Sequence, residues 1–168
     1  MTLGPALTAN DAAYQPGFED VDTSVSACVP MYGVYDFLDQ HGVRGRAAMR
    51  PFLEHFVMKC SPDECRDRWE AASPINQVRA DAPPFFVVHG GHDTLAWVED
   101  ARWFVEALRA VSTNPVLYAE LPHTQHAFDV MYTVRTAYVL DAISRWLEHL
   151  RQGVPASAAP VASLELGT

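Results

Sequence analysis

The stretch of sequence that decides the fold is PPFFVVHGGHDTL, residues 83–95. Its first half is a short apolar run beside turn-forming residues, a pattern typical of a strand that is covered on both faces. Its second half, HGGHD, places two histidines and an aspartate at the carboxyl end of that strand. Open parallel sheets carry their binding sites at this end. HGGHD could therefore be an oxyanion-hole loop, part of a metal site or the position of a catalytic acid.

Two further segments have the pattern of strands. SVSACVPMY (Ser24–Tyr32) is another apolar run bounded by turn residues, and PVLYAEL (Pro115–Leu121) follows the chain-breaking sequence STNP. Apolar residues recur at helical spacing over 93–111 and 133–153, so we expect a helix after each of the last two strands. This alternation predicts an α/β fold with right-handed βαβ units and a short, mostly parallel sheet of about three strands.

The segment 37–79 between the first two strands carries no clear strand. Its parts GRAAMRPFLEHFVMK and SPDECRDRWEAAS have helical patterns, which predicts a helical insertion over one end of the sheet. The end of the chain, 153–168, is rich in small residues and proline, so we expect a disordered tail after a domain at 1–152. Four apolar residues of the insertion are candidates to line a pocket, although core packing is the expected role of most of them: Met49, Phe52, Phe56 and Trp69.

The composition is that of an ordinary globular domain with an excess of acidic residues. Of the 168 residues, 49% are hydrophobic and 20% are charged, and the formal net charge is −9. This charge would repel a phosphate backbone, so nucleic acid is not an expected partner. Three cysteines with loose spacing favour a reducing compartment over a disulfide framework. Because the sequence shows neither a run long enough to span a bilayer nor a signal-peptide pattern, we expect a cytoplasmic protein.

Two of the three interpretations of HGGHD are weak. An oxyanion-hole loop of the HGG type precedes the nucleophile in the chain, and no GxSxG motif follows here. A metal site could draw on His89, His92, Asp93, His123 and His126, but two histidines three residues apart in a loop fix no coordination geometry. We therefore expect no metal and no other cofactor. Two cysteines, Cys60 and Cys65, are expected to be small buried side chains rather than ligands.

The third interpretation makes Asp93 a catalytic acid. Two histidines, His123 and His126, follow the next strand in LPHTQHAFDV and should lie at the same edge of the sheet. A carboxylate there could orient an imidazole and stabilise the imidazolium that forms when the imidazole takes a proton from a serine. Taken alone, Asp93 is better explained as a helix N-cap and each histidine as a hydrogen-bonded loop residue. The pair, in the order acid then histidine, favours the catalytic interpretation.

Longer stretches carry a family resemblance. FFVVHGGHDTLAWVEDARWFVEALR followed by LYAELPHTQHAFDV resembles the acid and histidine loops of α/β-hydrolase esterases and lipases, in the branch related to hormone-sensitive lipase. ALTANDAAYQPGFEDVDTSVSACVPMYGVYDF and ASPINQV extend the similarity from about Ala6 to Leu150. The resemblance implies the carboxyl-terminal half of an α/β-hydrolase that acts on a small ester or lipid substrate. It also implies that Asp93 is the acid and that His126 of the HAF triplet, and not His123, is the base.

The sequence departs from this family at the nucleophile. The family's serine lies in GxSxG, and the resemblance implies that GPALTAND is the end of the nucleophile helix, with the serine a few residues before Met1. We therefore expect this chain to be inactive alone. The strand Ser24–Tyr32 would become an exposed apolar edge, which predicts self-association through it. The alternative is a non-catalytic module that binds a partner through the same edge. None of the serines of the chain lies in the motif: Ser24, Ser26, Ser61, Ser73, Ser112, Ser144, Ser157 and Ser163.

Overall fold

The computed structural model describes residues 6–43 and 49–153. The contacts divide the chain into two compact units, 1–131 and 132–168. The first unit contains the sheet and its connections, and the described part of the second unit contains one long helix, α5 (Val134–Arg151). The tail that we predicted at 153–168 lies, apart from Gly153, outside the described residues.

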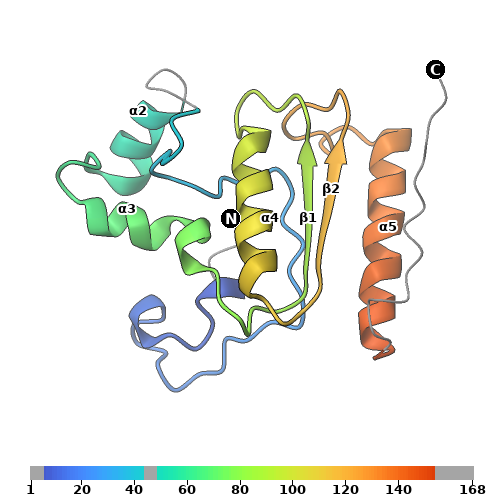
Figure 1. Cartoon of the computed structure of the whole chain (residues 1–168), viewed down its shortest axis with the longest axis horizontal. Coiled ribbons are helices and arrows are strands. Elements are labelled where there is room, and N and C mark those ends of the chain that lie inside the picture. The colour runs from blue at the N-terminus through green and yellow to red at the C-terminus, as the bar shows by residue number, and fades with distance from the viewer. Residues whose placement is uncertain (1–5, 44–48, 154–168) are drawn as a thin grey trace. The chain divides into compact units, whose positions relative to one another are not determined.

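Two parallel strands form the sheet of the first unit. Strands β1 (Phe85–Gly90) and β2 (Val116–Leu121) pair in parallel from Phe85 opposite Val116 to Gly90 opposite Leu121. They are joined by helix α4 (Val98–Val111), which lies beside the strands in Figure 1. The predicted strand–helix–strand order and the parallel pairing of these two strands are confirmed.

The predicted strand Ser24–Tyr32 is wrong as a continuous strand. It contacts the free edge of β1 through two isolated parallel bridges, Cys28 with Phe85 and Met31 with Val88. The reason lies at Pro30, whose carbonyl accepts from the Val88 N–H at 3.0 Å but which has no N–H to donate to β1 in return. The sheet therefore consists of two strands and one bridged segment, instead of the three strands expected.

The core of the first unit lies between the sheet and α4. All six residues of β1 are buried, which explains its continuous apolar sequence. The ring of Tyr35, from the connection after the bridged segment, stacks on Phe104 of α4 with centroids 4.6 Å apart. The α4 side chains that pack in this core follow helical spacing: Ala101, Phe104, Val105 and Leu108.

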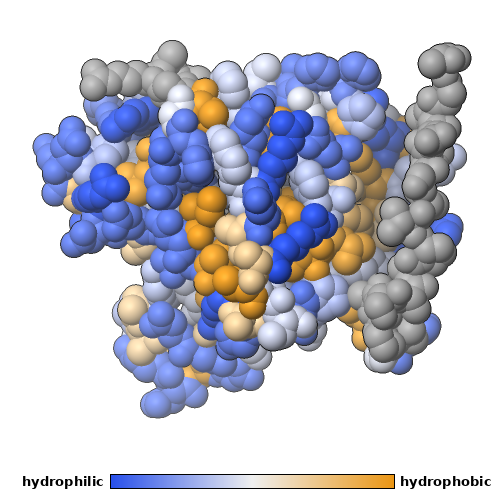
Figure 2. Space-filling model, viewed as in Figure 1, coloured by the Kyte–Doolittle hydropathy of each residue, from blue (hydrophilic) through white to orange (hydrophobic). Residues whose placement is uncertain are grey.

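The described part of the insertion is helical, as predicted. It contains α2 (Arg50–Phe52), the π-helical turn η2 (Leu53–Met58), α3 (Arg66–Ala72) and the 3₁₀ turn η3 (Pro74–Gln77). Its surface in Figure 2 is mostly hydrophilic, with a few apolar side chains between the polar ones. The insertion nevertheless has a small apolar core of its own, formed by Leu53, Met58 and Trp69.

This core separates the four pocket-lining candidates of the insertion. Trp69 is fully buried and Met49 packs against it, so both belong to the core. Phe52 and Phe56 stack on each other and are 56% and 73% exposed. In the first unit, core packing is thus the role of the buried Trp69 and the partly buried Met49, while Phe52 and Phe56 lie on the surface.

Two cysteines of the insertion differ from expectation. Cys60 and Cys65 form a disulfide bond, while Cys28 is a free and buried thiol. Treating Cys60 and Cys65 as separate small buried side chains was wrong, because their spacing of five residues lets the turn between them bring the two sulfurs together. Burial raises the pKa of the Cys28 thiol to about 11, so it stays protonated at neutral pH.

Helix α5 forms where helical spacing predicts it. The side chain of Thr133 caps its start by accepting a hydrogen bond from the Thr136 N–H at 3.2 Å. Over the residues that the structure describes, no helix is both long enough and apolar enough to cross a membrane.

Candidate active site

The carboxyl ends of β1 and β2 lie side by side, and the two loops that follow them are tightly joined. The Gly91 N–H donates to the Leu121 carbonyl at 2.8 Å, and the His92 N–H donates to the Thr124 carbonyl at 3.0 Å. A Cβ atom at Gly90 would lie 2.4 Å from the Thr124 carbonyl oxygen. A glycine is therefore required at position 90, because the backbone of the second loop passes where a side chain would begin.

Asp93, the predicted acid, is buried at this edge and is fully hydrogen-bonded. Its side chain is 0% exposed. Oδ1 accepts from the N–H groups of Leu95 and Ala96 at 2.9 and 2.8 Å. These bonds cap the turn that leads into α4, whereas α4 itself begins after Trp97. The interpretation of Asp93 as the N-cap of the helix is therefore wrong, because the N-cap of α4 is Trp97. The bonds to Oδ1 leave Oδ2 of Asp93 for a different partner.

That partner is His126, the predicted base. Its Nδ1 lies 2.7 Å from Asp93 Oδ2. An ionised carboxylate only accepts hydrogen bonds, so Nδ1 carries the proton and a neutral ring has its lone pair on Nε2. The side chain is 26% exposed, and Nε2 has no hydrogen bond to any residue of the described part of the chain. The geometry therefore leaves a proton acceptor open to an incoming group.

A second histidine, His89, lies behind the carboxylate. It is fully buried, and its Nε2 donates to the Ala96 carbonyl at 2.7 Å while lying 3.5 Å from Asp93 Oδ2. Burial lowers the pKa of His89, against the opposing effects of the Ala96 carbonyl and the Asp93 charge. His89 is therefore a neutral imidazole at pH 7, with its N–H on the side of Asp93.

The remaining two histidines of these loops do not join Asp93. His92 and His123 are exposed and stack on each other, with ring centroids 5.0 Å apart. No group of three or more histidine, cysteine or acidic side chains suited to a metal ion occurs in the described ranges 6–43 and 49–153. The five residues that we considered as metal ligands therefore fall into an acid–base pair, a buried neighbour and an exposed pair.

Tyr32 is a residue of this site that our sequence reasoning missed. It ends the bridged segment, donating its N–H to the Val88 carbonyl at 2.9 Å, so it lies at the same edge as the ends of β1 and β2. Its ring centroid lies 4.6 Å from that of His126, and its hydroxyl donates to Asp129 Oδ1 at 2.9 Å. The available signal was its position as the last residue of the predicted strand Ser24–Tyr32, immediately before Gly33.

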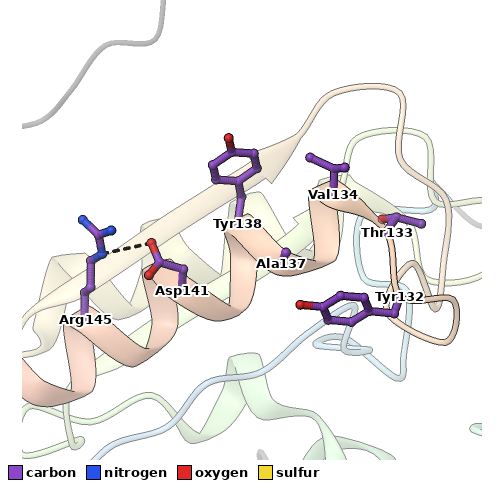
Figure 3. Close-up of a pocket in the computed structure, with 7 residues that line it drawn as sticks. All are labelled: Tyr132, Thr133, Val134, Ala137, Tyr138, Asp141 and Arg145. Carbon is purple, nitrogen blue, oxygen red and sulfur yellow. Dashed lines mark ion pairs between the residues drawn. The ribbon is translucent and has the colours of Figure 1, made fainter.

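Within residues 6–43 and 49–153, no hydroxyl nucleophile is hydrogen-bonded to this base. In the first unit, no described serine hydrogen-bonds His126, and Nε2 faces away from Asp93. The residues that line a hollow in the second unit include neither Asp93 nor His126. Figure 3 shows the residues that line this hollow, in which Arg145 and Asp141 form an ion pair at 2.9 Å: Tyr132, Thr133, Val134, Ala137, Tyr138, Asp141 and Arg145.

Several known proteins that are similar to this chain are named as esterases. Two curated relatives from Mycobacterium tuberculosis are the probable carboxylic ester hydrolase LipM, 46% identical over 92% of this chain, and the esterase LipQ, 44% identical over 94%. The chain spans only 36% and 39% of the length of these two relatives. A solved structure of the esterase Est2 from Thermogutta terrifontis, with propionate bound, superposes with a TM-score of 0.62 at 18% identity, over 89% of this chain and 52% of that one.

These similarities confirm the resemblance to α/β-hydrolase esterases and the corresponding fold class. The family model for BD-FAE matches residues 5–108, a range that contains the bridged segment, the insertion, β1 and Asp93. The match therefore reaches the acid of the candidate site, and the likeness to LipM and LipQ extends over nearly the whole chain. The chain belongs to the BD-FAE family, with the fold of the α/β-hydrolase esterases.

Proposed function

We propose that this chain supplies the acid and the base of a serine-type carboxylic ester hydrolase. The observation that carries the proposal is the 2.7 Å hydrogen bond between Asp93 Oδ2 and His126 Nδ1 at the carboxyl ends of two adjacent parallel strands. The names of LipM and LipQ support ester hydrolysis as the reaction. They lend no support to the alternative of a non-catalytic binding module.

In the proposed mechanism, His126 moves protons and Asp93 holds it in place. Nε2 of His126 accepts the proton of a serine hydroxyl as that oxygen attacks the ester carbonyl. The ring is then an imidazolium, whose charge is stabilised by the buried Asp93 carboxylate 2.7 Å away. Nε2 next returns the proton to the leaving alcohol, and the same two steps with water release the acid. The hydrogen bonds from the N–H groups of Leu95 and Ala96 to Oδ1 keep Asp93 oriented throughout.

We propose that the serine comes from polypeptide outside these 168 residues. No serine of the chain lies in a GxSxG sequence, and LipM and LipQ are both much longer than the part that this chain matches. The 168 residues alone should then hydrolyse esters no faster than variants that lack the base. A missing triad serine costs on the order of 10⁶ in rate in related chemistry.

The proposed substrate is a small uncharged carboxylic ester or a lipid ester. The propionate in the Est2 structure is a short carboxylate and supports an ester of a short acid as the first compound to test. A net charge of −9 disfavours polyanions such as nucleic acids as substrates or partners.

The test compares this chain with a version extended at its amino terminus by the residues that its gene encodes in frame. On p-nitrophenyl acetate, the extended protein should be active and the 168-residue chain inactive. His126→Ala should abolish the activity of the extended protein, and Asp93→Asn should lower kcat by about 10⁴-fold. His123→Ala is the matched control, because it removes an exposed histidine of the same loop and should keep most of the activity. Full activity in His126→Ala would refute the proposal.

We further propose that the 168-residue chain associates with itself through the bridged segment. The backbone groups of Cys28 and Tyr32 bond to β1, and those of Val29 and Met31 have no backbone hydrogen bonds among the described residues. Such an edge pairs readily with another strand. Val29→Lys should convert the oligomers to monomer in size-exclusion chromatography, since an edge lysine opposes pairing. A dilute chain that is already monomeric would contradict this proposal.

The cytoplasmic location inferred from the sequence stays a prediction. The Cys60–Cys65 disulfide weighs against it, because disulfides persist mainly in oxidising compartments. Rapid alkylation of free thiols in intact cells, followed by mass spectrometry, should show modified Cys60 and Cys65 if the chain resides in a reducing compartment. Unmodified, disulfide-bonded cysteines would contradict the location.

A further inference from the structure

We propose that Tyr32 is a positioning residue for His126, which it holds in the orientation that directs Nδ1 toward Asp93. The inference rests on the proposed function, because it assigns to Tyr32 a role in the same acid–base pair. Its basis is that three neighbouring segments of the sheet end at one edge, and each contributes one member: Tyr32, Asp93 and His126.

Tyr32 contacts His126 on the ring itself. The two ring centroids are 4.6 Å apart and the planes are inclined by 59°, so the tyrosine ring covers the imidazole and leaves the hydrogen bond to Asp93 unobstructed. Phe128 meets the same tyrosine edge to face at 5.7 Å. An imidazole can rotate about its bonds to the backbone, and the Tyr32 ring packed against it restricts that rotation. The contact therefore limits the orientations open to His126.

The hydroxyl of Tyr32 joins the bridged segment to the histidine loop. It donates to Asp129 Oδ1 at 2.9 Å, and Asp129 follows His126 by three residues. Burial raises the pKa of Tyr32, and so does the bond to the Asp129 carboxylate, so the hydroxyl keeps its proton. The hydrogen bond from Tyr32 to Asp129 thus holds the loop that carries His126 against the bridged segment.

The backbone around these residues is unusual in a way that fits a positioning role. Tyr32 has a φ of 42°, in the left-handed region that non-glycine residues seldom adopt. His123 and Ala127, on either side of His126, have φ values of 52° and 54°. Left-handed residues persist where the surrounding contacts determine them, and they concentrate at functional sites. Here Tyr32 lies on one side of its contact with the imidazole, and His123 and Ala127 lie in the loop on the other side.

The test uses nuclear magnetic resonance on the 168-residue chain, so it requires no ester hydrolysis. With ¹⁵N-labelled histidine, the exchange rate of the His126 Nδ1 proton with water reports how long the Asp93 bond stays closed. Tyr32→Phe removes only the hydroxyl, and exchange should be about fivefold faster because a hydrogen bond contributes about that factor. Tyr32→Leu removes the ring as well, and exchange should be at least tenfold faster.

The chain offers a matched control for Tyr32→Phe. Tyr118 donates its hydroxyl to Glu120 Oε2 at 2.9 Å, the same chemical pair at the same distance, but on β2. Tyr118→Phe should leave the exchange of the His126 Nδ1 proton unchanged. Asp129→Ala should increase the exchange rate of this proton as much as Tyr32→Phe does. The double variant should exchange no faster than either single variant, because both substitutions remove the same hydrogen bond between Tyr32 and Asp129. Equal exchange in Tyr32→Phe, Tyr118→Phe and the unmodified chain would overturn the inference.

The same variants in the amino-terminally extended protein separate this inference from the proposed function. If Tyr32 positions the base, Tyr32→Phe should lower kcat for p-nitrophenyl acetate about fivefold and leave KM nearly unchanged. If the extended protein hydrolyses esters but neither exchange nor kcat responds to Tyr32→Phe, only the positioning role is refuted. If exchange responds and no ester is hydrolysed in the presence of a serine nucleophile, the proposed function fails while the contact stands.

Discussion

The two loops at the carboxyl edge of the sheet and the helical insertion at 37–79 are held by different interactions. The loops are joined by backbone hydrogen bonds, such as those from Gly91 to Leu121 and from His92 to Thr124. The insertion instead surrounds a small apolar core and carries a disulfide. The geometry of the loops thus follows from the register of β1 and β2, whereas the part of the insertion around Leu53, Met58 and Trp69 is held by its own packing.

The candidate site should therefore tolerate changes in the core of the insertion better than changes at the strand ends. Among the described residues, no hydrogen bond or ion pair links the insertion core to Asp93 or His126, so we expect a disturbance of that core to leave the pair in place. A disturbance at the ends of the strands acts on the site at once, because the two loops touch through their backbones. A variant in the insertion core that moves Asp93 or His126, or a strand-end variant that leaves both in place, would contradict this independence of the two regions.

The largest effect on stability is expected at Trp69. Trp69→Ala leaves a cavity in the core of the insertion and removes the hydrogen bond from the indole to the Cys60 carbonyl at 3.2 Å. We expect a loss of about 4 kcal/mol in the free energy of unfolding, measured with urea. Phe56→Ala, at a position that is 73% exposed, is the control and should change it by less than about 0.5 kcal/mol.

The same variant tests the independence of the two regions. In the folded fraction of Trp69→Ala, the exchange rate of the His126 Nδ1 proton should equal that of the unmodified chain. Faster exchange of this proton in Trp69→Ala would show that the insertion core and the candidate site are coupled, and would contradict their independence.

A smaller loss of stability, joined to a loss of the site, is expected at Gly90. In Gly90→Ala the new Cβ would overlap the Thr124 carbonyl oxygen, so the histidine loop must move away from β1. We expect a loss of about 3 kcal/mol in urea unfolding and rapid exchange of the His126 Nδ1 proton. Gly91→Ala is the matched control, since its Cβ would meet its nearest atoms at an ordinary 3.4 Å. If Gly90→Ala kept the proton protected, the strand ends would not control the site.

Features that follow from the strands could be predicted from the sequence, and features that depend on turns could not. The apolar runs of β1 and β2 predict two buried parallel strands, and parallel strands end at one edge, so the meeting of Asp93 and His126 follows from their places after those strands. The break at Pro30 depends on one missing N–H within an otherwise strand-like pattern. The Cys60–Cys65 bond and the contact of Tyr32 with His126 depend on how turns fold in three dimensions, which spacing along the chain does not determine.

The smallest predicted effect concerns pH and the buried His89. Its pKa is lowered in the folded chain by burial, so below the unfolded value of about 6.5 the unfolded state binds a proton that the folded state does not. Stability from this group is therefore present above pH 6.5 and is lost as the pH falls toward the folded pKa. The expected slope is at most about 1.4 kcal/mol per pH unit. It should appear in urea unfolding between pH 6.5 and 5.

Two replacements of His89 separate titration from packing. His89→Asn and His89→Gln can each donate to the Ala96 carbonyl but cannot titrate, so both should lose this part of the slope even if they differ in stability at pH 7. A slope that persists in both variants would place the proton uptake on another group. A slope that disappears in both would assign it to the imidazole behind Asp93, at the edge of the sheet and not in the insertion.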